Sequence, residues 1–358
     1  MKLSTFSKNA TQFYKSGKSM YLRSAPGRGK TSTIIAAIPA IAAATEKSIG
    51  LSILSGPLLN VADVVGYLVP KHTDDGRVES HYTEPFWART DEGKRLEDYD
   101  GGIIFVDEAD KMDVDVKKIM GEMALSGRCG PHKLPDGWVV WMAGNRAGDR
   151  SGSTKELDHL INRRFEIDID DDLIGWEQWA LRNNVPPVIV TFAMNNPQIV
   201  FPTETPKVQG PFCTPRSLVS TGELLVTMSG NDGTLPDDTD AVEIAAAGIG
   251  SAAAEHLFAT IRLEQELPSI KSIVSDPDTA PVPVKPDAQM LISYKLAAIA
   301  DKANIEPLVT YMERLPADFA ATFAKGVGNR APMLIVTPAI QAWAKRNASL
   351  IGIMSMLK

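Results

Sequence analysis

The fold of this chain is decided by residues 24–31, which read Ser24-Ala25-Pro26-Gly27-Arg28-Gly29-Lys30-Thr31. The run matches the phosphate-binding pattern G-x-x-x-x-G-K-[ST] at every position except the first, where serine replaces glycine. An apolar, strand-like segment precedes it at 19–22, and a helix-like segment follows it at 31–38. This context favours a phosphate-binding loop, and a Gly/Lys-rich surface turn is the alternative that the mismatch leaves open.

Each part of such a loop has a separate task. Gly27 and Gly29 allow backbone angles that a side chain would block. Successive backbone N–H groups can then point at a polyphosphate, at the positive end of the following helix. Lys30 can reach the terminal phosphates, and the hydroxyl of Thr31 can bind magnesium. The nucleotide-binding residues that we expect are Ala25, Pro26, Gly27, Arg28, Gly29, Lys30, Thr31 and Ser32.

A second, independent signal lies at 101–108, where an apolar run ends in two carboxylates. The four apolar residues 103–106 suit a strand that is buried on both faces, as in a parallel sheet. Ligands of open α/β sheets bind at the carboxyl ends of the strands. We expect Asp107 to hold magnesium, directly or through water, and Glu108 to orient and activate the attacking water. Alone, this run could be a strand that ends in a solvated acidic turn.

The bulk composition is that of an ordinary globular chain with room for two or three domains in its 358 residues. A net charge of −7 argues against a protein wrapped around nucleic acid, although a local basic patch stays possible. Two cysteines far apart indicate a reducing, cytoplasmic compartment without a disulfide framework. The five histidines show no metal-ligand spacing. The first residues lack a signal-peptide core, and no apolar stretch reaches the roughly 18–20 residues of a membrane span.

Strand-like and helix-like segments alternate up to about residue 172, which predicts a parallel sheet with helices on both faces. Pro39 should end or kink the first helix. The polar stretch 71–84 reads as irregular, and the turn formers at 127–137 predict a hairpin or projecting loop. The further strands that we expect are 48–54, 103–106, 138–143 and 166–170, with helices at 61–67 and 114–125.

Beyond about residue 172 the pattern becomes helical. An irregular joint lies at 202–215, and a proline-rich connector begins at 276. The helices that we expect are 175–183, 188–193, 217–228, 241–266, 290–303, 305–314 and 336–346.

The order and spacing of the polar motifs along the chain resemble those of an AAA+ ATPase. The lysine loop resembles Walker A, Asp107-Glu108 resembles Walker B, and Asn145 resembles sensor 1. The pair Arg163-Arg164 resembles the arginine-finger position, and Arg216 resembles sensor 2. The resemblance covers residues 19–225 and is weaker over the C-terminal helices, where 311–316 is the most family-like phrase. Ser24 departs from the family pattern, and the two adjacent arginines leave the choice of finger open.

The closer resemblance is to the MoxR-type branch, which includes the dynein-related bacterial ATPases. Three stretches carry it, namely 63–68, the run 134–138 followed by 143–146, and Asn162-Arg163-Arg164-Phe165. The resemblance implies a three-layer P-loop NTPase fold with a parallel sheet. The implied parts are an AAA+ α/β core at 1–205, an α-helical lid at 206–275, a proline-rich connector at 276–287 and a C-terminal helical extension at 288–358 that packs on the lid.

The resemblance also implies roles, with ATP and Mg²⁺ as cofactors. Asn145 would hydrogen-bond the attacking water or the γ-phosphate. Arg164 would reach the nucleotide of a neighbouring subunit, with Arg163 as the alternative finger or a helper, and Arg216 would touch the γ-phosphate from its own subunit. A finger that acts between subunits implies a closed, usually hexameric ring. Without the family context, Asn145 could be a polar strand end and the arginine pair a solvated basic cluster.

Three functions remain open on the sequence. The leading one is an ATP-driven remodeller of a protein partner, since the MoxR-like branch often works with a von Willebrand A domain protein. The second is a nucleic-acid-dependent motor or DNA-processing subunit, and the third is a nucleotide-gated structural ring without translocation. Basic residues of the two insertions favour the second reading, and acidic neighbours weaken it. The basic residues are Lys71, Arg77, Arg128, His132 and Lys133, and the acidic ones are Asp74, Asp75, Glu79 and Glu84.

Overall fold

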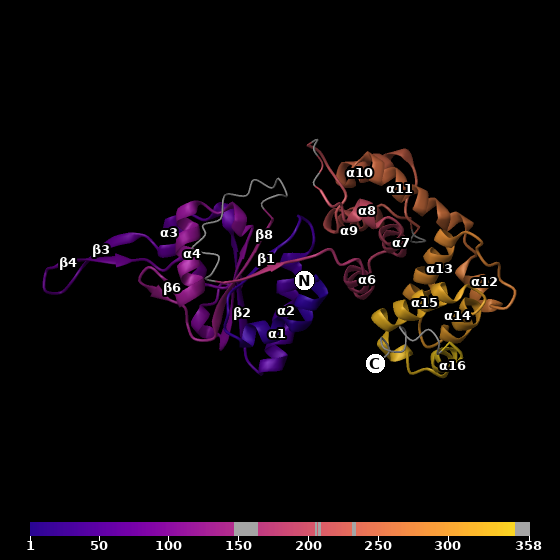
Figure 1. The fold of residues 1–358 in the computed structure, drawn as a ribbon, viewed down its shortest axis with the longest axis horizontal. Helices are drawn as coiled ribbons and strands as arrows, with labels where there is room; N and C mark the ends of the chain where they lie inside the picture. The colour runs from indigo at the N-terminus through magenta and orange to yellow at the C-terminus, as the bar shows by residue number, and fades with distance from the viewer. Residues whose placement is uncertain (147–163, 205, 207–208, 231–233, 348–358) are drawn as a thin grey trace. The chain divides into compact units, whose positions relative to one another are not determined.

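The computed structural model describes residues 1–146, 164–204, 206, 209–230 and 234–347. The chain divides into two compact units, Met1–Asp172 and Leu173–Lys358. The first unit contains the strands and the second is helical (Figure 1). Each unit has its own buried apolar clusters, so each is described by itself.

The first unit is built on a five-stranded sheet in which every pairing is parallel. The strand order is β2-β5-β8-β1-β9. The strands are β1 (Met20–Arg23), β2 (Ile49–Ser55), β5 (Gly101–Asp107), β8 (Trp138–Gly144) and β9 (Phe165–Asp168). All five strands expected from the sequence are therefore present. Because the pairings are parallel, the carboxyl ends of β1, β5 and β8 meet at one edge of the sheet.

Helices cover both faces of the sheet, which confirms the three-layer α/β fold (Figure 1). On one face, α1 (Leu3–Lys15) and α2 (Lys30–Thr45) bury Phe6 and Ile34 against Phe105 and Trp141. On the other face, α4 (Val114–Ser126) buries Met120 against the even-numbered residues of β5 and β8, such as Ile104 and Val140. Helix α3 (Val61–Val65) packs against α4. The central strands β5 and β8 are buried along nearly their whole length, as the continuous apolar runs predict.

Two local expectations need correction. Helix α2 does not end at Pro39 but continues to Thr45. Pro39 and Ile35, four residues earlier, both lie on the exposed side of the helix, so the carbonyl that loses its helical donor faces water. The stretch 71–84 is not irregular, because most of it forms an antiparallel hairpin of β3 (Leu68–His72) and β4 (Val78–Tyr82).

The turn of this hairpin uses Gly76 at a φ of 81°, a backbone conformation that favours glycine. Figure 1 shows the hairpin extending away from the sheet. A second, shorter hairpin of β6 (Arg128–Cys129) and β7 (His132–Lys133) confirms the prediction for 127–137.

The second unit contains helices around two apolar clusters. The first cluster contains side chains from helices α6 through α11, among them Phe192, Leu218 and Phe258. The second contains side chains from helices α12 through α16, among them Phe323 and Trp343. The helices are α6 (Leu173–Arg182), α7 (Pro187–Asn195), α8 (Pro197–Val200), α9 (Pro215–Thr227), α10 (Thr239–Ile249), α11 (Ser251–Arg262), α12 (Ile270–Ser275), α13 (Pro286–Ile299), α14 (Ile305–Met312), α15 (Ala317–Arg330) and α16 (Pro338–Arg346).

The observed division differs from the expected boundaries. The segment 173–200 forms α6, α7 and α8, which share one core with α9, α10 and α11, so it belongs to the helical unit and not to the α/β core. The proline-rich stretch is not a bare spacer, because Ala280 is buried in the second helical cluster. The expected helix 241–266 is interrupted at Gly250, whose φ of 82° ends α10 before α11 begins.

Across the described residues, no helix is long and apolar enough to cross a membrane.

Candidate functional site

The lysine loop connects β1 to α2 and has the backbone that the sequence predicts. Gly27 and Gly29 adopt φ values of 73° and 87°, in the region that side chains rarely occupy. Gly29 is the residue that precedes the first turn of α2, so the N–H groups at this helix end face the loop. The first turn of a helix carries partial positive charge, which suits an anionic ligand.

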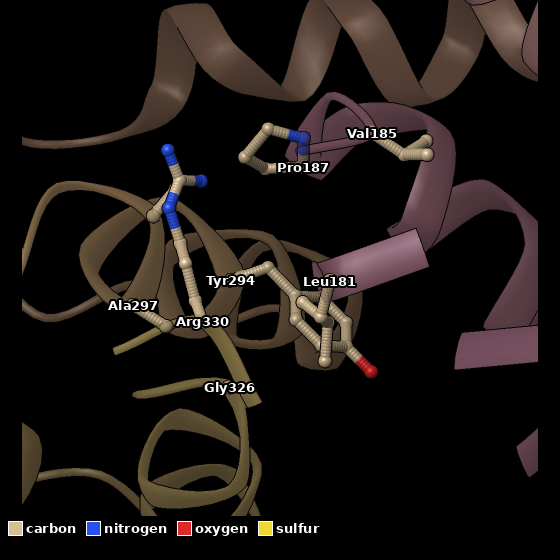
Figure 2. A pocket seen from close by; sticks show the side chains of 8 residues that line it. Leu181, Val185, Pro187, Tyr294, Ala297, Gly326 and Arg330 are labelled. Atoms are coloured by element: carbon tan, nitrogen blue, oxygen red, sulfur yellow. The ribbon is translucent and has the colours of Figure 1, made fainter. Parts of the chain in front are cut away.

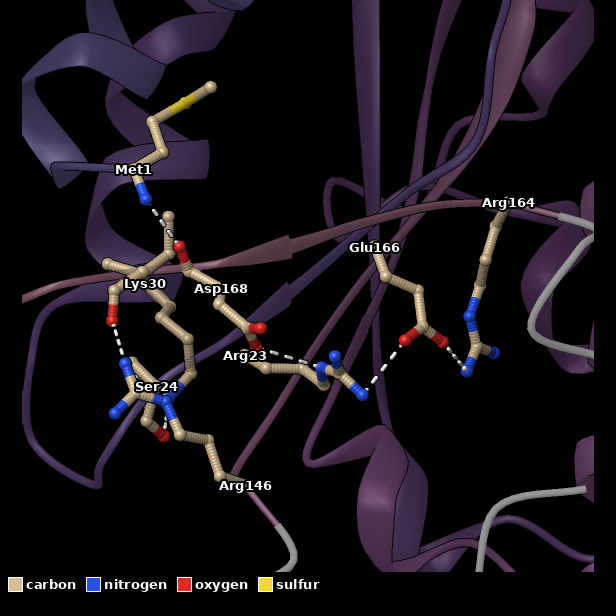
Figure 3. Close-up of polar contacts among 9 residues, drawn as sticks. Met1, Arg23, Ser24, Lys30, Arg146, Arg164, Glu166 and Asp168 are labelled. Carbon is tan, nitrogen blue, oxygen red and sulfur yellow. Dashed lines mark hydrogen bonds and ion pairs between the residues drawn. The ribbon is translucent and has the colours of Figure 1, made fainter.

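Ser24, the mismatch in the motif, supports the lysine. Its side chain is buried, and its hydroxyl accepts a hydrogen bond from Lys30 Nζ at 2.8 Å (Figure 3). The same hydroxyl donates to the carbonyl of Ala25 at 2.8 Å. Lys30 Nζ also donates to the Ser24 carbonyl at 3.2 Å. Lys30 is only 8% exposed, so its ammonium is fixed close to the loop backbone.

The loop and the acidic strand meet in one short hydrogen bond. Thr31 Oγ1 donates to Asp107 Oδ2 at 2.6 Å. The other carboxylate oxygen of Asp107 accepts the backbone N–H of Glu108 at 2.9 Å. A hydroxyl and a carboxylate are oxygen ligands of the kind that Mg²⁺ takes together with substrate phosphates. Thr31 and Asp107 therefore fit the magnesium position that the sequence predicts.

Glu108 occupies a special backbone conformation at the end of β5. Its φ is 50° and its ψ is 38°, which is uncommon for a residue with a side chain and typical of functional turns. The backbone at Gly56 of the same chain approaches Glu108 closely, since a Cβ on Gly56 would lie 2.6 Å from the carbonyl oxygen of Glu108. The carboxylate accepts from Lys111 Nζ at 2.8 Å and is 45% exposed, so water can reach it.

Asn145 follows the last residue of β8 and lies beside the loop. Lys30 Nζ donates to Asn145 Oδ1 at 3.4 Å, and the N–H of Ser24 donates to the carbonyl of Gly144 at 3.3 Å. The structure thus links Lys30, Thr31, Asp107 and Asn145 by direct contacts, although they come from three separate parts of the sequence.

Arg164 lies where the sequence did not lead us to expect it. Its side chain is 3% exposed and forms an ion pair with Glu166 at 3.2 Å. Its guanidinium carbon lies 4.1 Å from the ring centroid of Tyr21. A side chain that reaches a neighbouring subunit would be exposed, so the observed placement differs from the expectation. Arg163 lies outside the described residues.

Arg216 belongs to the second unit, on the exposed side of α9. Helix α9 begins at Pro215, two residues before the expected start at 217, because the side chain of Thr214 accepts from the N–H of Ser217 at 3.1 Å and caps the helix. The proposed contact of Arg216 with the γ-phosphate stays a prediction.

Sequence reasoning missed the acidic side chains that hold the arginines around the loop. Arg23, directly before Ser24, pairs with Glu166 at 2.8 Å and with Asp168 at 3.2 Å (Figure 3). Arg28 within the loop pairs with Asp171 at 2.6 Å. The available signal for the two partners of Arg23 was the alternation of acids at 166 and 168, which places both side chains on one face of β9. Only the register of β9 against β1 shows which basic residues face them.

A small cavity lies in the helical unit, and its size excludes it as a substrate site. It is lined by residues that include Leu181, Tyr294, Gly326 and Arg330 (Figure 2). Its volume is about 10 Å³, which is room for no more than a single water molecule.

No protein-family model matches the sequence, and no curated protein matches it. Similar solved structures include a candidate ATPase from Cytophaga hutchinsonii, with 12% identity, a TM-score of 0.34, and coverage of 72% of this chain and 88% of the other. They also include two mutants of RuvB from Thermotoga maritima. One has 14% identity, a TM-score of 0.36 and coverage of 74% and 69%. The other has 12% identity, a TM-score of 0.31 and coverage of 96% and 86%.

Similarity at this level carries no argument about activity. The chain's own strand order and loop geometry define its class, which is the P-loop NTPase α/β fold followed by a helical C-terminal region.

Proposed function

We propose that the protein is a ring-forming AAA+ ATPase that hydrolyses ATP with Mg²⁺ and remodels a protein partner or complex. The observation that carries the proposal is the 2.6 Å hydrogen bond between Thr31 and Asp107. It joins the loop that would bind the phosphates to the carboxylate that would hold the metal. The contact of Lys30 with Asn145 supports the proposed sensor role of Asn145.

The residues of the site have distinct tasks in the proposed reaction. Lys30 and the loop N–H groups bind the β- and γ-phosphates, and Thr31 and Asp107 hold the magnesium. Bound Mg²⁺ supplies charge neutralisation on the phosphate oxygens. Glu108 accepts a proton from the attacking water while a new bond forms to the γ-phosphorus and the bond to the leaving ADP oxygen breaks. Asn145 orients that water or the γ-phosphate.

The ring and its partner rest on the resemblance to the MoxR-like branch. We propose a homo-oligomeric, usually hexameric ring in the cytoplasm, in which an arginine of one subunit completes the site of its neighbour. An arginine finger needs an exposed side chain, and the side chain of Arg164 is buried. We therefore propose Arg163, the other member of the expected pair, as the finger. Arg216 would contact the γ-phosphate from the same subunit. A von Willebrand A domain protein is the adaptor that the branch suggests.

The β3–β4 hairpin is the surface that we propose for the protein partner. Its strands are exposed along almost their full length, and apolar side chains such as Leu68 and Val78 are 56% and 61% exposed. Apolar residues on a protruding, otherwise polar hairpin are typical of a surface that another protein covers.

The charges of the same hairpin disfavour the nucleic-acid alternative. Arg77 pairs with Asp75 at 2.8 Å, and the ladder places Lys71 directly opposite Glu79. Basic residues that already face carboxylates have less charge left to neutralise phosphates. ATPase assays with single- and double-stranded DNA at low and physiological salt test this. A steep, salt-sensitive stimulation by DNA would favour a nucleic-acid motor over a protein remodeller.

Capture of the partner tests the proposal most directly. Glu108→Gln should bind ATP without hydrolysing it and thereby hold the partner. Tagged Glu108→Gln should co-purify with a protein when ATP is present and lose it when ATP is withheld. Lys30→Ala, which should bind no ATP, is the matched control. Equal recovery of proteins by both variants would contradict ATP-driven remodelling.

A further inference from the structure

We propose that Arg164 is a positioning residue that acts within its own subunit, and that it is not the arginine donated to a neighbouring site. This inference rests on the proposed ATPase function and refines it. The side chain is 3% exposed, so nearly all of it is enclosed by its own subunit. Figure 3 shows its guanidinium directed toward Glu166 of the same chain.

The contacts of Arg164 come from three neighbouring strands of the sheet, β8, β1 and β9. On β9, its Nη2 pairs with Glu166 at 3.2 Å. On β1, the guanidinium lies over the ring of Tyr21, 4.1 Å from the centroid, and Tyr21 is itself buried. On β8, its Nη1 lies 3.5 Å from the sulfur of Met142. One side chain therefore spans β8, β1 and β9 at the same level.

These contacts lie directly beneath the functional residues. Tyr21 precedes the loop residue Ser24 by three positions, and Met142 precedes Asn145 by three positions. A Cβ on Gly144 would lie 2.4 Å from the hydroxyl of Tyr21, so the ring that Arg164 covers also touches the end of β8. Fixing this ring fixes the spacing between the lysine loop and Asn145.

Glu166 extends the same network to the loop. It is 13% exposed and bridges two arginines, since it pairs with Arg23 at 2.8 Å as well as with Arg164. Arg23 is the residue directly before Ser24. Removal of Arg164 would leave Glu166 with one arginine fewer in a largely enclosed position, where a lost charge partner is costly. Withdrawing Arg164 toward another subunit would break the ion pair and the aromatic contact together.

The two possible roles of Arg164 predict different kinetics. A finger acts on the transition state in a neighbour's site, so its loss should lower kcat and leave ATP binding almost unchanged. A positioning residue beneath the loop should change ATP binding as well as kcat. We expect Arg164→Ala to weaken ATP binding by about tenfold or more and to lower kcat. Glu166→Gln, which keeps the shape but removes the charge, should reproduce the weaker binding. Arg164→Lys should lie between Arg164→Ala and the wild type.

The second unit offers a matched control. Arg314 lies over the ring of Tyr311 at 5.6 Å in a similar arginine–tyrosine contact. Arg314→Ala should leave ATP affinity unchanged. Thermal unfolding of each variant without nucleotide shows whether it folds. If Arg164→Ala does not fold, Glu166→Gln and Arg164→Lys still decide the question, because normal ATP affinity in both would overturn the inference.

A mixing experiment decides between the two subunits. Glu108→Gln subunits have an intact Arg164, and Arg164→Ala subunits have an intact Glu108. Co-purification of differently tagged subunits first establishes that the mixed assemblies form. If Arg164 acts in its own subunit, the mixture should hydrolyse ATP no faster than Arg164→Ala alone. Recovery of a large fraction of the wild-type rate would overturn the inference. A wild type that does not hydrolyse ATP would instead contradict the proposed function, so the two failures are distinguishable.

Discussion

At the scale of single residues, the site depends on Lys30 being held in place before any phosphate arrives. Its ammonium donates to oxygens of Ser24, Ala25 and Asn145 while the side chain is 8% exposed. A phosphate that enters the loop therefore meets a positive charge whose side-chain entropy is already largely lost. Ser24 contributes to this arrangement through its hydroxyl, so the motif's one mismatch has a physical function.

The first prediction concerns this charge. Lys30→Ala should weaken ATP binding by about 100-fold or more, which corresponds to about 2.8 kcal/mol. Isothermal titration calorimetry with Mg·ATP measures the affinity. Lys118→Ala, which removes a surface lysine paired with Asp115 at 2.9 Å, is the control and should bind normally. An unchanged affinity in Lys30→Ala would refute the role of the loop.

The second prediction concerns Cys129. Burial raises the pKa of its thiol from 9.0 to about 11, and Sγ lies 3.1 Å from the carbonyl of Val64. Because the thiolate is the reactive form, native Cys129 should alkylate slowly with iodoacetamide at pH 8 and rapidly after denaturation. Because folding raises this pKa, the thiol's contribution to the free energy of unfolding is fully present below about pH 9. That contribution is lost as the pH rises through about 11. Mass spectrometry of the Cys129 peptide measures the labelling, and rapid labelling of the native protein would contradict the burial.

Residues with a local pattern could be predicted from the sequence, and residues whose position depends on strand register could not. The loop, Asp107, Glu108 and Asn145 each follow or precede a recognisable apolar run. The burial of Arg164 depends on the register that sets Glu166 beside Tyr21, and no local pattern encodes that register.

At the scale of helices and strands, close packing of α13 and α15 shows how little room the helical unit has. A Cβ on Gly326 would lie 2.6 Å from the Cβ of Ala297. Both helices lie at the centre of the second helical cluster, which includes Leu296 and Phe323. A larger side chain at residue 326 would therefore push the two helices apart.

The third prediction follows from this contact. Gly326→Leu should destabilise the helical unit by about 1–3 kcal/mol, the usual cost of overpacking. Urea unfolding followed by circular dichroism measures the change. Gly210→Ala is the control, because a Cβ there would meet no atom within 4 Å. Equal unfolding midpoints for Gly326→Leu and the wild type would show that the helices do not pack this closely.

Elements with strong apolar periodicity could be predicted, while other elements required the tertiary structure. The expected strands are present, but α1 went unnoticed although Phe6 and Ala10 face the sheet. The β3–β4 hairpin is exposed on both faces, so its strands lack the alternation that marks a half-buried strand. Gly250 divides the expected helix 241–266 because its positive φ begins a new helix at Ser251.

At the scale of the whole molecule, the chain consists of two units with separate cores. The lysine loop and its partners all belong to Met1–Asp172, whereas Arg216 belongs to Leu173–Lys358. The change of pattern at about residue 172 coincides with this division, whereas the resemblance implied a later boundary at residue 205. The core shared by α6, α7 and α9 assigns the segment after Asp172 to the helical unit.

The fourth prediction uses this division. A ligand that binds only the folded state stabilises it by about 2.7 kcal/mol at a concentration 100 times its Kd. Saturating Mg·ATP should therefore raise the unfolding temperature of the first unit in differential scanning calorimetry. Gly326→Leu should instead lower the transition of the second unit. Lys30→Ala should show no shift with ATP, and a wild type that also shows none would contradict nucleotide binding.

The central claim is that Glu108 activates water for ATP hydrolysis at the site formed by the loop and β5. Phosphate release from saturating Mg·ATP, measured for the wild type and Glu108→Gln at equal ATP occupancy, tests it most directly. Loss of a general base typically costs about 10²–10⁴-fold in rate. We predict that the wild type releases phosphate and that Glu108→Gln binds ATP with similar affinity but hydrolyses it at least about 100-fold more slowly. A Glu108→Gln protein that keeps the wild-type rate, or a wild type that releases no phosphate, would contradict the claim.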